Sequence, residues 1–151
     1  MSEAAPIELA PKRLSRVSGA GRGVRVGGRW AHLVLALGVV AGVFVQVYLI
    51  GAYIFGAGQR ALDAHKTAGW TVHGFEMLVF VAALVAWLPW VDIVLSLLLA
   101  VIGTVQVSLA SEHRWVGGVH PVLALVVVGL AAMLVLRALR RRRNARFPQR
   151  S

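Results

Sequence analysis

The fold is decided by residues 30–59, WAHLVLALGVVAGVFVQVYLIGAYIFGAGQ, a run in which no side chain is charged. A helix of about 20 residues crosses the roughly 30 Å hydrocarbon core of a bilayer, so this run is long enough to span a membrane. Inside lipid the backbone amides have no water to bond, and a helix satisfies them within its own segment. We therefore predict a membrane-spanning helix over residues 31–55.

Three more apolar segments follow, and charged residues separate them. We predict spans over residues 69–88, 91–110 and 121–139, with Glu76 as the one charged residue away from the span ends. The chain of 151 residues is 58% hydrophobic and 15% charged, with a mean hydropathy of +0.74. A soluble domain of this size cannot bury so much apolar surface, which excludes a soluble globular enzyme. The expected fold is all-α: an integral membrane four-helix bundle of up-down-up-down topology over residues 30–139.

The basic residues are concentrated in the two tails. Of 16 lysines and arginines, six lie within residues 12–29 and seven within residues 137–150. Because basic residues accumulate on the cytoplasmic side, we expect a multi-pass protein of the cell membrane with both termini in the cytoplasm. We expect residues 1–29 to be a disordered basic tail and residues 140–151 a second basic tail. Their expected partners are anionic lipid headgroups of the bilayer, and not nucleic acid.

Polar side chains inside the predicted spans gather toward the extracytoplasmic half. They are Gln46, His73, Glu76, Gln106 and His120. A carboxylate such as Glu76 is costly within a membrane, so a functional role is the first interpretation. Gln46 and Gln106 are expected to hydrogen-bond between helices. His32, near the opposite face, is expected to be an interfacial residue without a task.

Residues 63–76, DAHKTAGWTVHGFE, hold the histidines that point to chemistry. His65 and His73 are eight residues apart, about 12 Å along a helix, which is too far for both to bind one iron. Gly69, between them, would let a flat macrocycle approach the backbone. His120 opens the fourth span, and two histidines from facing helices are the usual way in which a bundle holds a haem. We therefore expect a b-type haem bound by His120 and either His65 or His73.

The segment Asp63-x-His65-Lys66-x-x-Gly69 resembles the acid–histidine–basic–glycine segment of haem A synthase. In that family the histidine pairs with one that opens the fourth span of the same four-helix half, a position that His120 matches. The resemblance implies that His65 and His120 ligate haem and that Asp63 supports a ligand by hydrogen bonding. This chain has one such half instead of two, and its acidic residue stands two positions before the histidine instead of three, so the resemblance does not imply the enzyme's activity.

Residues 30–137 as a whole resemble an uncharacterised bacterial family of four-span membrane proteins of unknown function. Its members share an Asp-x-His…Gly…His segment and a His-Pro start to the last span, as in His120-Pro121. This resemblance implies the architecture and no activity.

Three alternatives to haem binding remain open at the level of sequence. Glu76 suits a small proton-coupled transporter whose path Gln46 and Gln106 would line. His73 and Glu76, three residues apart on a helix, suit a divalent metal site together with His120. The third alternative is a structural or assembly protein without a ligand. The chain has no cysteine, no phosphate-binding loop and no apparent Ser-His-Asp set, so the sequence favours a binding protein over an enzyme.

Overall fold

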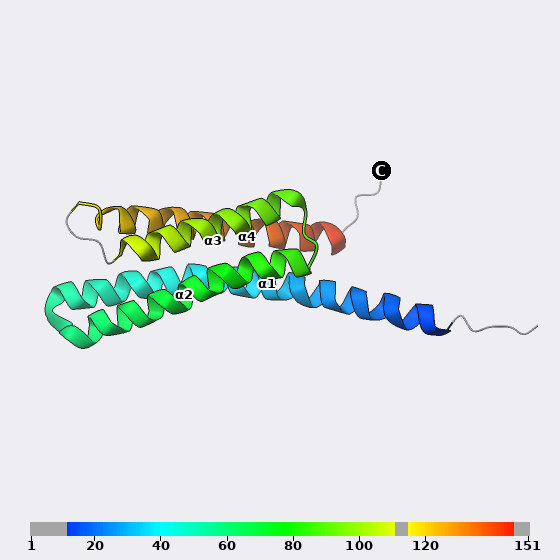
Figure 1. Ribbon diagram of the computed structural model, residues 1–151, viewed down its shortest axis with the longest axis horizontal. Coiled ribbons are helices and arrows are strands. Elements are labelled where there is room, and N and C mark those ends of the chain that lie inside the picture. The colour runs from blue at the N-terminus through cyan, green and yellow to red at the C-terminus, as the bar shows by residue number, and fades with distance from the viewer. Residues whose placement is uncertain (1–11, 111–114, 147–151) are drawn as a thin grey trace, which may run out of the picture.

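The computed structural model describes residues 12–110 and 115–146, and these residues are almost entirely helical (Figure 1). The helices are α1 (Lys12–Ala52), α2 (Gln59–Val85), α3 (Trp90–Leu109) and α4 (Val119–Arg146), with a short π-helical turn, η1 (Tyr53–Ala57), after α1. The described residues form no strand. Four helical segments are long and apolar enough to cross a membrane. The predicted all-α fold, with four helices long and apolar enough to cross a membrane, is thereby confirmed.

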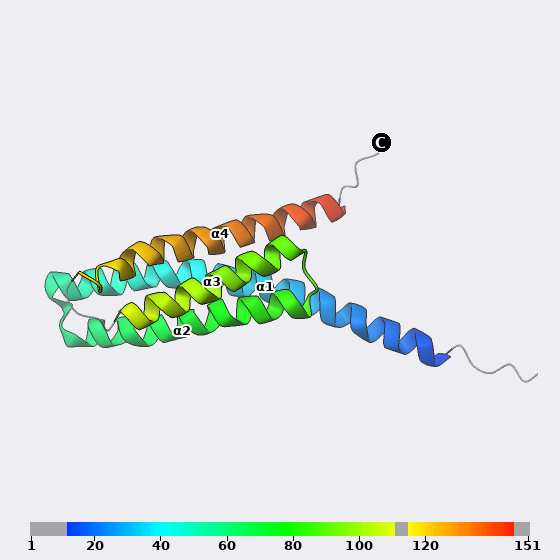
Figure 2. The same cartoon turned by 45° about the horizontal axis from the view of Figure 1, so that its top comes forward.

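The four helices lie side by side, and each packs against two others (Figures 1 and 2). The contacts run from α1 to α2, α2 to α3, α3 to α4 and α4 back to α1, so α2 lies diagonally opposite α4 and α1 opposite α3. One end of the bundle, here called the loop end, holds η1 and the turn of residues 115–118. The other, called the tail end, holds the turn of residues 86–89 and the basic parts of α1 and α4. In both views α1 extends past the bundle at the tail end.

The observed helix ends match the predicted span boundaries only where a change in hydropathy coincides with the end of the helix. α3 lies within one residue of the predicted span 91–110 at both ends. α1 begins at Lys12 instead of near residue 31, and α2 begins at Gln59 instead of near residue 69. A helix already formed in lipid extends into polar sequence at little cost, and hydropathy does not record that extension. The expected disorder of the first tail therefore does not describe residues 12–29, while residues 1–11 and 111–114 and the last five residues lie outside the described ranges.

A layer of apolar side chains fills the middle of the bundle. Val39, Val79, Leu99 and Val127 come from the four different helices and are fully buried. Large apolar residues on the outside of the same helices are exposed, among them Phe44, Leu125 and Leu136. An apolar exterior around an apolar core is the expected surface of a bundle surrounded by lipid.

Glycines set the close approaches and the sharp turn between α1 and α2. Gly56 and Gly58 have φ values of 95° and 78°, in the left-handed region that favours glycine, and they reverse the chain after η1. On α1, Gly42 packs directly against Val72 of α2, and a Cβ at Gly42 would overlap the Val72 side chain. Small residues at such contacts let membrane helices pack closely.

We predict that Gly42→Ala destabilises the bundle by about 1–3 kcal/mol, because the added methyl group must push α2 away from α1. The control is Gly51→Ala on the same helix, where a Cβ meets nothing within 4 Å. The control protein should unfold at the same temperature as the wild type, or slightly higher, since alanine favours helix. Thermal unfolding in detergent measures both, and equal midpoints for the two variants would contradict the packing described.

Candidate functional site

Two histidine rings face each other across the interior at the loop end. His65 on α2 and His120 on α4 have ring centroids 6.4 Å apart, with their planes at 81°. Because α2 and α4 are diagonal in the bundle, the two rings approach through its interior. Of the two partners predicted for His120, the structure therefore brings His65 to it.

Each of these imidazoles is held by a backbone carbonyl on a neighbouring helix. His65 Nδ1 lies 3.1 Å from the Gln46 carbonyl oxygen on α1, and His120 Nδ1 lies 3.0 Å from the Gln106 carbonyl oxygen on α3. A carbonyl only accepts, so both Nδ1 atoms must carry the proton and donate it. In the neutral imidazole this leaves a lone pair on each Nε2. Histidines that bind metals are typically held in this way, by a hydrogen bond from the other ring nitrogen.

The same arrangement occurs once in each helical hairpin. The α1–α2 hairpin supplies the Gln46–His65 hydrogen bond, and the α3–α4 hairpin supplies the Gln106–His120 hydrogen bond. The resemblance implied that Asp63 would support a ligand by hydrogen bonding, but the partners of the two rings are the backbone carbonyls of Gln46 and Gln106. The Asp63 carboxylate instead accepts a hydrogen bond from Gln59 Nε2 at 3.3 Å.

The spacing of the two rings fits ligation of one metal from opposite sides. With nitrogen–metal bonds of about 2.0–2.1 Å, two imidazoles on opposite faces of one ion have ring centroids roughly 6 Å apart. Two neighbouring ligands of a tetrahedral ion would be closer together. The observed 6.4 Å is close to this value, so His65 and His120 are the residues that would hold a haem iron, and imidazole is a ligand that haem uses.

The space beside Gly69 is filled by the side chain of Gln46. A Cβ at Gly69 would lie 2.8 Å from Gln46 Nε2, so this glycine serves close packing of α1 and α2 here. The Gln46 side-chain oxygen is buried and has no hydrogen-bond partner. An amide with an unsatisfied oxygen is weakly held. For a macrocycle to reach the Gly69 backbone, the Gln46 side chain has to turn away.

Glu76 and His73 form a separate pair, one turn apart on α2. His73 Nδ1 lies 3.0 Å from Glu76 Oε2, and Glu76 is 2% exposed. The carboxylate is seated against Gly103 of α3, which leaves no room for a Cβ at that position. Among the described residues, no three histidine, cysteine or acidic side chains come together to hold a metal ion. The structure thus does not gather His73, Glu76 and His120 into one ligand set.

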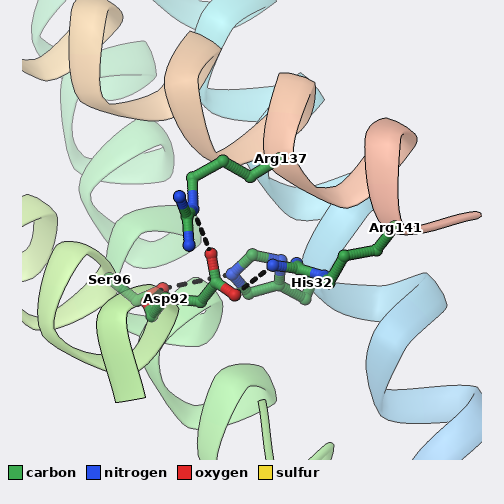
Figure 3. A network of polar contacts seen from close by, with 5 residues as sticks. All are labelled: His32, Asp92, Ser96, Arg137 and Arg141. Atoms are coloured by element: carbon green, nitrogen blue, oxygen red, sulfur yellow. Dashed lines mark hydrogen bonds and ion pairs between the residues drawn. The ribbon is translucent and has the colours of Figure 1, made fainter. Parts of the chain in front are cut away.

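The tail end holds a second polar network, shown in Figure 3. Asp92, at the start of α3, is fully buried and forms ion pairs with Arg137 and Arg141 of α4. The Arg137 Nε–Asp92 Oδ1 distance is 2.6 Å. Ser96 donates a hydrogen bond to the Asp92 carbonyl oxygen at 2.7 Å, and His32 Nε2 lies 3.1 Å from the Ser96 hydroxyl oxygen. Because Ser96 has already used its only proton, His32 Nε2 is the donor and its Nδ1 keeps the lone pair.

Sequence reasoning missed this network. It placed His32 at the interface, whereas the structure buries it completely, in contact with Ser96 of α3. A signal was present in the spacing: Asp92 and Ser96, like Arg137 and Arg141, are four residues apart and so share a helix face. The network contains a serine, a histidine and an aspartate, but the serine proton is bound to a carbonyl and all three residues are buried, so it is not arranged as a hydrolase site.

The two polar regions are separated by the apolar layer. On α3, the buried Leu99 lies between Ser96 of the tail-end network and Gly103, which touches Glu76. Val79 occupies the corresponding place on α2, one turn beyond Glu76 toward the tail end. The bundle therefore carries different chemistry at its two ends.

Comparison with known proteins gave no match to any family model, curated protein or solved structure.

We predict that Gly103→Ala destabilises the protein by about 1–3 kcal/mol, because its methyl group takes the place of the Glu76 carboxylate. Removing the carboxylate should relieve the overlap, so the double variant with Glu76→Ala should unfold at a higher temperature than Gly103→Ala alone. Gly129→Ala, where a Cβ meets nothing within 4 Å, is the control. Strictly additive losses in the double variant would show that the two positions are not in contact.

Proposed function

We propose that this multi-pass membrane protein binds a b-type haem through His65 and His120 near the extracytoplasmic face, for electron transfer or haem handling. One observation carries the proposal: two imidazoles from opposite hairpins have ring centroids 6.4 Å apart, and each donates a hydrogen bond from Nδ1–H to a backbone carbonyl oxygen. Haem, when bound, supplies one-electron chemistry, and the protein supplies position and surroundings.

The residues around the pair have distinct parts in this proposal. The Gln46 and Gln106 carbonyls hold the rings in the tautomer that can ligate, without a charge that would have to be buried. His65 and His120 belong to different hairpins, so a shared metal would tie the α1–α2 and α3–α4 halves together. The resemblance of residues 63–69 and His120 to one half of haem A synthase supports the same pairing.

We also propose an orientation, in which the helices cross the cell membrane in alternate directions with both tails in the cytoplasm. The tail end carries most of the chain's arginines, which favours the cytoplasmic side. The loop end, with the histidine pair, then faces outward. A redox or assembly partner on that side is part of the proposal.

A proton-coupled transporter built on Glu76 is the second candidate. It is favoured by one observation, a membrane-buried carboxylate paired with His73. It is weakened by the apolar layer, because fully buried valines and a leucine lie between Glu76 and the tail end. The haem proposal accounts for more of the loop-end polar groups than the transporter does, since it gives a role to His65 and His120 and to the backbone carbonyls of Gln46 and Gln106.

The first test is the visible spectrum of the protein produced with added haem precursor and purified in detergent. The wild type should show a Soret band, and His65→Ala and His120→Ala should each lose it, because each removes one axial ligand. His73→Ala is the matched control on the same helix and should keep the band. A colourless wild type would overturn the proposal, and loss of the band in His73→Ala but not in His65→Ala would reassign the ligand.

The orientation is tested by single-cysteine labelling, which is direct because the chain has no cysteine of its own. Gln59→Cys at the loop end and Ala145→Cys at the tail end both replace exposed residues. In intact cells, a maleimide that cannot cross membranes should label the cysteine at position 59, and should label the one at position 145 only after the cells are opened. The reverse pattern would place the histidine pair on the cytoplasmic side.

A further inference from the structure

Two arginines share one carboxylate at the tail end, which leaves positive charge unbalanced there. Arg137 and Arg141 both pair with Asp92, and Asp92 is the only acidic residue that the described part of the chain places at this end. The other described acidic residues, Asp63 and Glu76, lie on the far side of the apolar layer. Further arginines lie on the tail-end parts of α1 and α4: Arg25, Arg29, Arg140, Arg142 and Arg143.

Asp92 fixes the guanidinium groups of Arg137 and Arg141 while contacting only one nitrogen of each. Asp92 is fully buried, whereas the Arg137 and Arg141 side chains are 36% and 33% exposed. Each pairs with Asp92 through one nitrogen, Nε of Arg137 and an Nη of Arg141. A guanidinium carries five N–H donors, so most of the donors remain available on groups whose inner side is fixed. Such preorganisation lowers the entropy cost of binding a ligand from outside.

Tryptophans place these arginines at the level of the lipid headgroups. The Arg142 guanidinium lies 3.4 Å from the centroid of the Trp30 ring, and that of Arg25 lies 4.9 Å from the centroid of the Trp87 ring. Both rings are exposed, as expected for tryptophans at the boundary between hydrocarbon and headgroups. Arg141 directly precedes Arg142 on α4, so its guanidinium belongs to the same layer.

We propose that Arg137 and Arg141, held by Asp92, form a binding site for the phosphate of an anionic phospholipid such as phosphatidylglycerol. Guanidinium forks match phosphate oxygens in pairs, and basic pockets between membrane helices on the cytoplasmic side are known to bind acidic headgroups. This site differs from the general attraction of a basic tail, because it depends on two particular arginines and on their carboxylate. It does not rest on haem binding.

The experiment measures lipid binding to the purified full chain in a neutral detergent by native mass spectrometry, after circular dichroism has shown that each variant is helical. The probes are phosphatidylglycerol and phosphatidylcholine with identical acyl chains, and inorganic phosphate as competitor. The wild type should prefer phosphatidylglycerol. Arg141→Lys should weaken its binding about tenfold, because the charge stays but the paired hydrogen bonds to phosphate are lost. Arg140→Lys, the exposed neighbour without a contact to Asp92, should change it less than about twofold.

Asp92→Asn provides a second test that leaves every arginine in place. General attraction predicts tighter binding, since the net positive charge rises. A built site predicts weaker binding, since the guanidiniums lose the group that orients them. Equal effects of Arg140→Lys and Arg141→Lys, tighter binding by Asp92→Asn, or no preference over phosphatidylcholine would each overturn the proposal. Displacement of the lipid by millimolar inorganic phosphate would do so too, because the site would then recognise the free anion.

Discussion

A polar group placed within a bilayer must find its partner inside the protein, and this constraint organises the bundle. Hydroxyl groups on the helices meet it locally: Ser96 and Thr104 donate to carbonyls four residues earlier. Some imidazole and carboxylate side chains find their hydrogen-bond or ion-pair partners on another helix. The His65 and His120 imidazoles donate to carbonyls of α1 and α3, and Asp92 is neutralised by arginines of α4.

Satisfying these groups produces two polar regions with an apolar layer between them. The loop end presents two imidazoles whose Nδ1–H groups are bound to backbone carbonyls, which leaves Nε2 of each ring for a ligand. The tail end presents guanidinium groups with free donors, which suit an anion. Val39, Leu99 and their neighbours form a fully buried apolar layer between the two regions, which therefore share no polar side chain. The two proposed activities are therefore chemically independent.

The sequence predicted features that depend on one segment alone, such as the positions of the spans. It did not predict features that depend on how the helices pack, such as the partners of the polar side chains. Hydropathy located all four spans, because apolar length is a property of each segment. It did not place the starts of α1 and α2, which continue through polar residues. Histidine spacing left both His65 and His73 as partners for His120, because the rotation of α2 is set by its contacts with α1 and α3. The supporting carbonyls carry no side-chain signal, and the ion pairs of Asp92 were not predicted because its arginine partners lie 45 and 49 residues away.

The haem proposal requires that His65 and His120, whose ring planes lie at 81° to each other, both ligate one iron. Electron paramagnetic resonance of the oxidised, haem-loaded protein tests this most directly, because the ferric signal reports both the number of axial ligands and their relative orientation. Ligation by both imidazoles should give a low-spin signal of large anisotropy, as expected for two imidazoles with nearly perpendicular planes. A high-spin signal from a haem with one axial ligand, or a protein that takes up no stoichiometric haem, would contradict it.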